Sequence, residues 1–145
     1  MKLLHQATPE GSAAACLATV FGLGNTEAVQ KKLDNLEDLG LYVTDRVTAV
    51  LTEYGYTFSI KFPALDPWGS KEHDTKPAEA MHTAHIEKRG TYLAHVPTLN
   101  GEDDGHWVIV TKTEILDPST KQRYIGADTS LEPYALIKLE RPNYG

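Results

Sequence analysis

The sequence contains a single cysteine and lacks any long apolar run. Cys16 has no second cysteine with which to form an internal disulfide, which is typical of proteins in a reducing cytoplasm. No segment approaches the roughly 20 consecutive apolar residues that a membrane-spanning helix needs. Residues 1–4 resemble the start of a signal peptide, but polar residues follow at once and argue against export. We therefore expect a cytoplasmic protein without a membrane span.

Positive charge is also scarce. The 14 lysines and arginines are outnumbered by 20 aspartates and glutamates, which leaves a formal net charge of −6. Nucleic acids and anionic membranes attract the opposite balance, so the charge argues against both as partners. The length of 145 residues, with 41% hydrophobic and 23% charged residues, suits one globular domain with a sizeable core. There is no internal repeat, and we predict a single domain over residues 1–145.

Helical signals dominate the first half of the chain. An alanine-rich run with Leu17, Val20 and Phe21 at helical spacing predicts a helix that starts near Ser12, where serine is an ordinary N-cap. Further helices are predicted from about Asn25 or Thr26 to residue 36, from the cap Thr44-Asp45 to Gly55, and from residue 77 to 89. On the last of these, Glu79, His82 and His85 share a spacing compatible with metal binding, but no further ligands accompany them. We interpret them as a solvated face and predict no metal.

Strand signals dominate the second half. Alternating, β-branched and aromatic segments predict strands at residues 56–62, 91–96, 106–110, 114–117, 123–127 and 134–139. An order of helices first and strands afterwards is typical of an α+β fold, here N-terminal helices packed on a C-terminal, mainly antiparallel sheet.

Two residues of this second half form a candidate catalytic pair. His106 begins one predicted strand and Asp117 ends the next. With the turn centred at Thr111-Lys112, paired residue numbers sum to 223 and His106 faces Asp117, with Cβ atoms about 5 Å apart. An imidazole and a carboxylate can hydrogen-bond at that separation, and an aspartate commonly orients a histidine base in this way. Thr-Lys is not a favoured two-residue turn, so another register stays open.

Two stretches resemble the C39-type papain-like peptidases, which include bacteriocin-processing domains and their stand-alone relatives. In that family a glutamine precedes the catalytic cysteine by six positions, and the cysteine opens a helix of small residues. Here Gln6 precedes Ser12, and residues 13–20 read Ala-Ala-Ala-Cys-Leu-Ala-Thr-Val. The family's second motif is similar to residues 93–96 (Leu-Ala-His-Val), 105–109 (Gly-His-Trp-Val-Ile) and Asp117-Pro118. The resemblance covers most of the chain.

The resemblance implies a papain-like fold and a cysteine peptidase that hydrolyses a peptide or amide bond without a cofactor. It assigns the oxyanion hole to Gln6 and the nucleophile's position to Ser12, where the family has cysteine. It makes His106 the general base and Asp117 the acid that orients it. The implied partner is a peptide or protein substrate, whose sequence the chain does not reveal, and the oligomeric state is likewise not predicted.

Alternatives remain open for the acid and for the nucleophile. The interval of eleven residues between the histidine and Asp117 is shorter than in the family, so Asp103 and Asp104 are alternative orienting acids. Ser12 is compatible with an engineered Cys→Ser change, a natural serine in a non-catalytic relative, or a mere helix cap. Cys16, which fits the family's second, non-catalytic cysteine, is a further candidate nucleophile.

These alternatives lead to different functions. A hydroxyl is far less acidic than a thiol, so we expect little turnover from the chain as written. The leading hypothesis is a cysteine-peptidase-type hydrolase silenced at residue 12. The alternative is a non-catalytic module that binds a peptide without cutting it. A relative that acts on a non-peptide amide or acyl group is a third.

Overall fold

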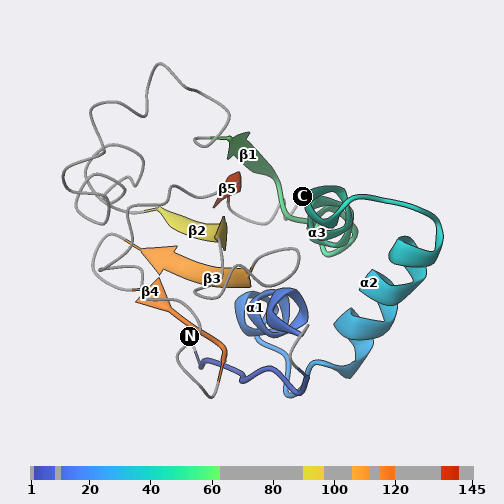
Figure 1. Ribbon diagram of the computed structural model, residues 1–145. Coiled ribbons are helices and arrows are strands. Elements are labelled where there is room, and N and C mark those ends of the chain that lie inside the picture. The colour runs from blue at the N-terminus through green and yellow to red at the C-terminus, as the bar shows by residue number, and fades with distance from the viewer. Residues whose placement is uncertain are drawn as a thin grey trace.

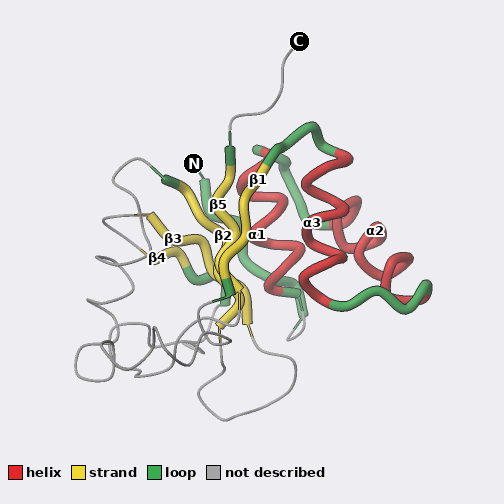
Figure 2. Tube along the Cα trace, turned by 90° about the horizontal axis from the view of Figure 1, so that it is seen from above, coloured by secondary structure: helices red, strands yellow, loops and turns green. Residues whose placement is uncertain are grey.

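The computed structural model describes residues 2–8, 11–62, 90–96, 106–111, 115–119 and 135–140. These residues form three helices, α1 (Ser12–Phe21), α2 (Glu27–Asp38) and α3 (Val43–Glu53). They also form five strands, β1 (Phe58–Lys61), β2 (Thr91–Val96), β3 (His106–Thr111), β4 (Ile115–Leu116) and β5 (Ala135–Leu139). The helices lie together on one side of the sheet (Figures 1 and 2). The predicted α+β arrangement of helices packed on an antiparallel sheet is confirmed.

The sheet has the strand order β1-β5-β2-β3-β4, and every described pairing is antiparallel. The predicted strands at 91–96, 106–110 and 134–139 are confirmed to within one residue by β2, β3 and β5. The strands β1 and β4 are shorter than predicted. The predicted helix at 77–89 and strand at 123–127 lie outside the described residues, as do Glu79, His82 and His85.

Helix α1 begins at Ser12, as predicted, but for a different reason. Gly11 occupies the N-cap position, and no side chain caps the helix. The Ser12 hydroxyl instead accepts a hydrogen bond from a strand, described below. Gly22, at φ 71°, ends the helix in the left-handed conformation that glycine adopts without strain. The small residues of α1 let its backbone lie close to β3.

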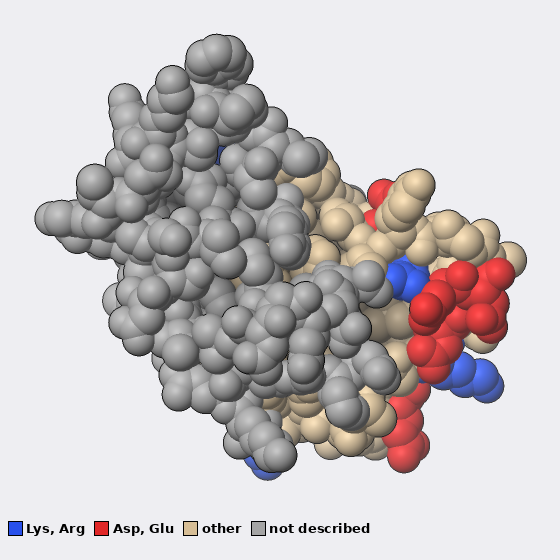
Figure 3. Space-filling model, viewed as in Figure 1, with Lys and Arg blue, Asp and Glu red and all other residues tan. Residues whose placement is uncertain are grey.

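Helix α2 starts as predicted, with Thr26 at its N-cap position, although no side chain caps the helix there, whereas the start of α3 differs from the predicted cap. Asn25 lies before α2, and its side-chain oxygen accepts the backbone N–H of Glu27 at 3.1 Å. The predicted cap Thr44-Asp45 of α3 is wrong, because the helix already begins at Val43 with Tyr42 as its N-cap. The exposed charges of this pair of helices gather on the helical side of the molecule (Figure 3). Such exposed groups contribute little to stability.

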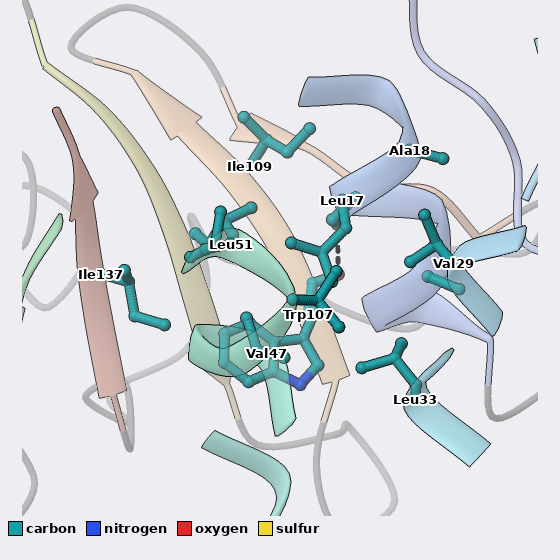
Figure 4. Close-up of a cluster of buried hydrophobic side chains, with 13 residues drawn as sticks. Leu17, Ala18, Val29, Leu33, Val47, Leu51, Trp107, Ile109 and Ile137 are labelled. Carbon is teal, nitrogen blue, oxygen red and sulfur yellow. Dashed lines mark hydrogen bonds between the residues drawn. The ribbon is translucent and has the colours of Figure 1, made fainter. Parts of the chain in front are cut away.

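The main core fills the space between the helices and the sheet (Figure 4). Its fully or almost fully buried members include Leu17, Val29, Leu33, Val47, Leu51, Trp107, Ile109 and Ile137. Burying one such aliphatic side chain contributes about 1.5–3 kcal/mol. Alternate residues of β2 and β3 point to the other face, where Tyr92, Ala94, Val108 and Val110 form a second buried cluster. By the same alternation the side chain of His106 belongs to this second face.

None of the helices in the described part of the chain combines the length and apolar character that a bilayer crossing requires. The longest, α2, has 12 residues.

Candidate active site

The start of α1 lies against the start of β3. The backbone N–H of Trp107 donates a hydrogen bond of 3.1 Å to the Oγ of Ser12, whose side chain is almost fully buried. The Trp107 nitrogen is bonded to the carbonyl carbon of His106, so the Ser12 oxygen lies within about 5.5 Å of the His106 Cα. The structure therefore brings the predicted nucleophile position against the backbone at the start of the strand that carries the predicted base, although the two residues are far apart in the sequence.

His106 contacts the predicted acid directly. Its Nε2 lies 2.7 Å from the Oδ1 of Asp117. His106 is 1% exposed, and the Asp117 side chain is 20% exposed, so the pair is largely removed from water. A hydrogen bond at Nε2 fixes the orientation of the ring and leaves Nδ1 as its other site for proton exchange. This is the arrangement in which a carboxylate orients a histidine base.

The predicted register of the β3–β4 hairpin is wrong, although the predicted contact forms. Ile109 pairs with Leu116 and Val110 with Ile115, so paired residue numbers sum to 225. His106 and Asp117 are therefore offset by two positions, not opposed. A shift of two residues keeps a side chain on the same face of a sheet, whereas a shift of one would reverse it. The imidazole reaches the carboxylate because diagonal neighbours on one face remain within reach of long side chains.

Ser119 adds two more donors to the same carboxylate oxygen. Its backbone N–H lies 2.9 Å and its hydroxyl 2.8 Å from the Asp117 Oδ1. Burial on its own raises the pKa of Asp117, but the hydrogen bonds from His106 and Ser119 outweigh burial and hold this pKa below its ordinary value. The carboxyl group is therefore ionised at neutral pH and can stabilise a positive charge on His106.

Gln6 lies beside the start of α1. Its backbone N–H donates to the carbonyl of Pro118 at 2.9 Å, which ties it to the residue after Asp117. A Cβ placed on Gly11 would lie 3.5 Å from the Gln6 Cβ, so the two residues are in contact range. The Gln6 side-chain amide donates to the carbonyl of Thr8 at 3.0 Å, in the loop that leads into the helix. Gln6 thus lies next to Gly11, which directly precedes residue 12, and next to the Asp117 turn.

Cys16 lies one helical turn beyond Ser12 and is fully buried. Its Sγ donates to the carbonyl of Trp107 at 3.4 Å, so Ser12 and Cys16 contact the two backbone polar groups of one strand residue. Burial, with a further contribution from the charge of Asp117, raises the pKa of the Cys16 thiol well above its ordinary value. A protonated, buried thiol is a poor nucleophile, which disfavours Cys16 as the reactive group.

The sequence reasoning missed Ser119 and the Trp107 N–H. An aspartate followed two residues later by serine is a signal for a local turn in which the carboxylate accepts the N–H of the second residue, so Ser119 was within reach. A backbone donor such as that of Trp107 has no signature in a sequence. The alternative acids Asp103 and Asp104 lie outside the described residues.

Over the described ranges, the acidic, histidine and cysteine side chains form no group of three that could hold a metal ion. The chain matches no protein-family model, no curated protein and no solved structure. Its function must therefore be inferred from the geometry around Ser12 and His106.

Proposed function

We propose that the chain is a papain-like, C39-like hydrolase domain of the cysteine-peptidase type, in which Ser12 occupies the nucleophile's position. The observation that carries the proposal is the hydrogen bond from the Trp107 N–H to the Ser12 Oγ. That bond places the first residue of a helix next to a histidine that is itself bonded to an aspartate. A nucleophile, a base and an acid that orients the base are the minimum set for covalent hydrolysis, and the base and the acid are in direct contact here.

Two features of the site favour a negatively charged sulfur at position 12. The first N–H groups of α1 have no partners within the helix, and the helix dipole is positive at this end. The Trp107 N–H adds a donor aimed at the γ atom of residue 12. Both features act to lower the pKa of a thiol placed there, as at the helix N-termini of reactive cysteines, and they oppose the burial of this position, which acts to raise that pKa.

The proposed reaction follows from these positions. A cysteine at residue 12 gives its proton to the Nδ1 of His106 and attacks the carbonyl carbon of a peptide. Asp117 holds the ring through Nε2 and stabilises the imidazolium that results. His106 then returns the proton to the leaving amine, and water hydrolyses the acyl-enzyme.

The oxyanion of the tetrahedral intermediate is assigned to two donors. These are the backbone N–H of residue 12 and the side-chain amide of Gln6. The Gln6 amide donates to Thr8 in the structure, but an amide nitrogen carries two N–H groups. Loss of one oxyanion donor typically costs 100- to 1,000-fold in rate, of the order of 3–4 kcal/mol.

A non-catalytic peptide-binding module is the second candidate, and Ser12 itself is the observation that favours it. A serine keeps the shape of cysteine but loses the acidity that thiolate chemistry needs. The chain as written can then bind a peptide while performing no covalent step. The two candidates differ in one property, the reactivity of a cysteine restored at position 12.

The test is the Ser12→Cys variant, alkylated with iodoacetamide at pH 6. Its matched control is Ser59→Cys, which puts a thiol on an exposed position of β1 at the opposite edge of the sheet. An ordinary thiol with a pKa near 8.5 is below about 1% ionised at this pH. Allowing for the lower intrinsic reactivity of an acidic thiolate, we expect Ser12→Cys to react at least about tenfold faster. Thiolate absorbance in the ultraviolet gives a readout that does not depend on probe access.

The role of the base is tested in the same experiment. The double variant Ser12→Cys/His106→Ala is expected to lose the enhanced reactivity, provided that its melting temperature shows it to be folded. In the unmodified chain, we expect only the slow alkylation of the buried Cys16 thiol. Equal reactivity and equal thiolate content in Ser12→Cys and Ser59→Cys would reject the hydrolase and favour the binding module.

A further inference from the structure

We propose that Ser119 is a positioning residue of this site, whose backbone N–H and hydroxyl hold the Asp117 carboxylate in the orientation that binds His106. The inference rests on the proposed function for its consequence in catalysis. The contacts themselves do not depend on it. Ser119 is not part of the motifs that resemble a peptidase.

The contacts converge on one atom. The Oδ1 of Asp117 accepts the Nε2–H of His106 at 2.7 Å, the N–H of Ser119 at 2.9 Å and the hydroxyl of Ser119 at 2.8 Å. Asp117 follows β4, which ends at Leu116, so strand pairing does not hold its backbone. Rotation about the side-chain bonds of an aspartate would otherwise be broad. The two bonds from Ser119 restrict that rotation.

Pro118, the residue between Asp117 and Ser119, anchors the turn that these three residues form. Pro118 is buried, and its ring fixes its own φ. Its carbonyl accepts the backbone N–H of Gln6 at 2.9 Å, and the Nδ1 of His5 lies 3.3 Å from the same oxygen. The turn is therefore tied to the segment that leads into α1. Ser119 therefore orients the carboxylate within a turn that is itself held by the N-terminal segment.

The charges around Asp117 are consistent with this role. The groups near it are the imidazole of His106 on β3, the thiol of Cys16 on α1 and the imidazole of His5 in the N-terminal segment. Burial raises the pKa of Asp117, and both Ser119 bonds are among the contacts that bring this pKa below its ordinary value. Removal of the Ser119 hydroxyl should therefore raise the pKa of Asp117 back toward its ordinary value.

The test compares three substitutions in the Ser12→Cys background. Ser119→Ala removes the hydroxyl, Ser119→Thr keeps it, and Ser59→Ala removes an exposed hydroxyl at the opposite edge of the sheet. Loss of one hydrogen bond to a charged group corresponds to roughly a tenfold effect. We expect alkylation at pH 6 to slow about tenfold in Ser119→Ala and to recover in Ser119→Thr. A rate in Ser119→Ala equal to that of Ser59→Ala would overturn the proposal.

A second measurement separates this proposal from the proposed function. Carbon-13 NMR follows the titration of the Asp117 carboxyl in the chain with Ser12 intact, so it needs no nucleophile. The midpoint should rise in Ser119→Ala and return in Ser119→Thr, a response that a merely structural role would not give. If Ser12→Cys shows no enhanced reactivity, the proposed hydrolase function is rejected. The titration of Asp117 still tests the positioning role of Ser119, because it does not depend on that function. An unchanged midpoint overturns the positioning role.

Discussion

His106 and Asp117 form a hydrogen bond of 2.7 Å at the end of the sheet where α1 begins. The bond joins a fully buried imidazole to a carboxylate that is still one-fifth exposed. The buried imidazole has little access to water, so its orientation is set by the carboxylate, which hydrogen-bonds to its Nε2. The first prediction concerns what this pair contributes to folding.

Asp117→Asn should lower the stability of the chain at neutral pH and have little effect in acid. The pKa of Asp117 is lowered in the folded protein, so its contribution is present above the unfolded value of about 3.9 and is lost as the pH falls through the lower, folded value. Urea unfolding at pH 7, 4 and 3 should show a difference between parent and variant that shrinks with acidity. Asp38→Asn, an exposed substitution on α2, is the control. A difference as large at pH 3 as at pH 7 would contradict the prediction.

The second prediction concerns Cys16. Its thiol is fully buried, and burial raises its pKa, so the folded chain as written should react with Ellman's reagent only as fast as it opens. The rate in native buffer should match the unfolding rate measured independently, and full reaction should follow at once in denaturant. Rapid, complete reaction of the native chain would show that Cys16 is accessible and would reopen it as a candidate nucleophile.

Much of the fold could be predicted because its signals are local. The dense apolar pattern of residues 91–96 and 106–110 indicated β2 and β3 to within one residue, and the alanine-rich run indicated α1. The start of α3 could not be predicted as well, because Thr44 and Asp45 are equally acceptable as caps and as first-turn residues. The hairpin register was also missed. It depends on the connection between β3 and β4, and Thr-Lys has no strong turn preference.

The contact between His106 and Asp117 was predicted from the sequence, whereas the partner of the Ser12 hydroxyl was not. A hydroxyl at a helix start predicts a cap, yet Ser12 bonds to the backbone of Trp107, a partner 95 residues away that no local rule identifies. The pairing of His106 with Asp117 survived the register error because an offset of two preserves the face. Position along a strand was therefore sufficient to predict this contact, whereas tertiary backbone contacts required the structure.

The third prediction concerns how α1 is held against the sheet. Leu17 is fully buried in the main core, one residue after Cys16. Leu17→Ala should destabilise the chain by about 2–5 kcal/mol, because it removes buried methyl groups and leaves a cavity. The matched control is Leu39→Ala at a position that is 75% exposed, which should change stability by less than about 0.5 kcal/mol. Urea denaturation measures both, and equal effects would place Leu17 outside the core.

The last prediction separates the two steps assigned to the site and concerns Gln6. In the Ser12→Cys background, Gln6→Ala should leave alkylation by iodoacetamide nearly unchanged, because no oxyanion forms in that reaction. Hydrolysis of a peptide ester or amide should fall on the order of 100-fold, because one oxyanion donor is lost. Gln6→Glu is the matched variant, since it keeps the size of the side chain while replacing the amide donor with an acceptor. The Gln6 backbone bond to Pro118 is retained in both variants, so the Asp117 turn should stay in place. If Gln6→Ala slows alkylation as much as hydrolysis, Gln6 acts on the nucleophile or on the fold, and the oxyanion assignment is wrong.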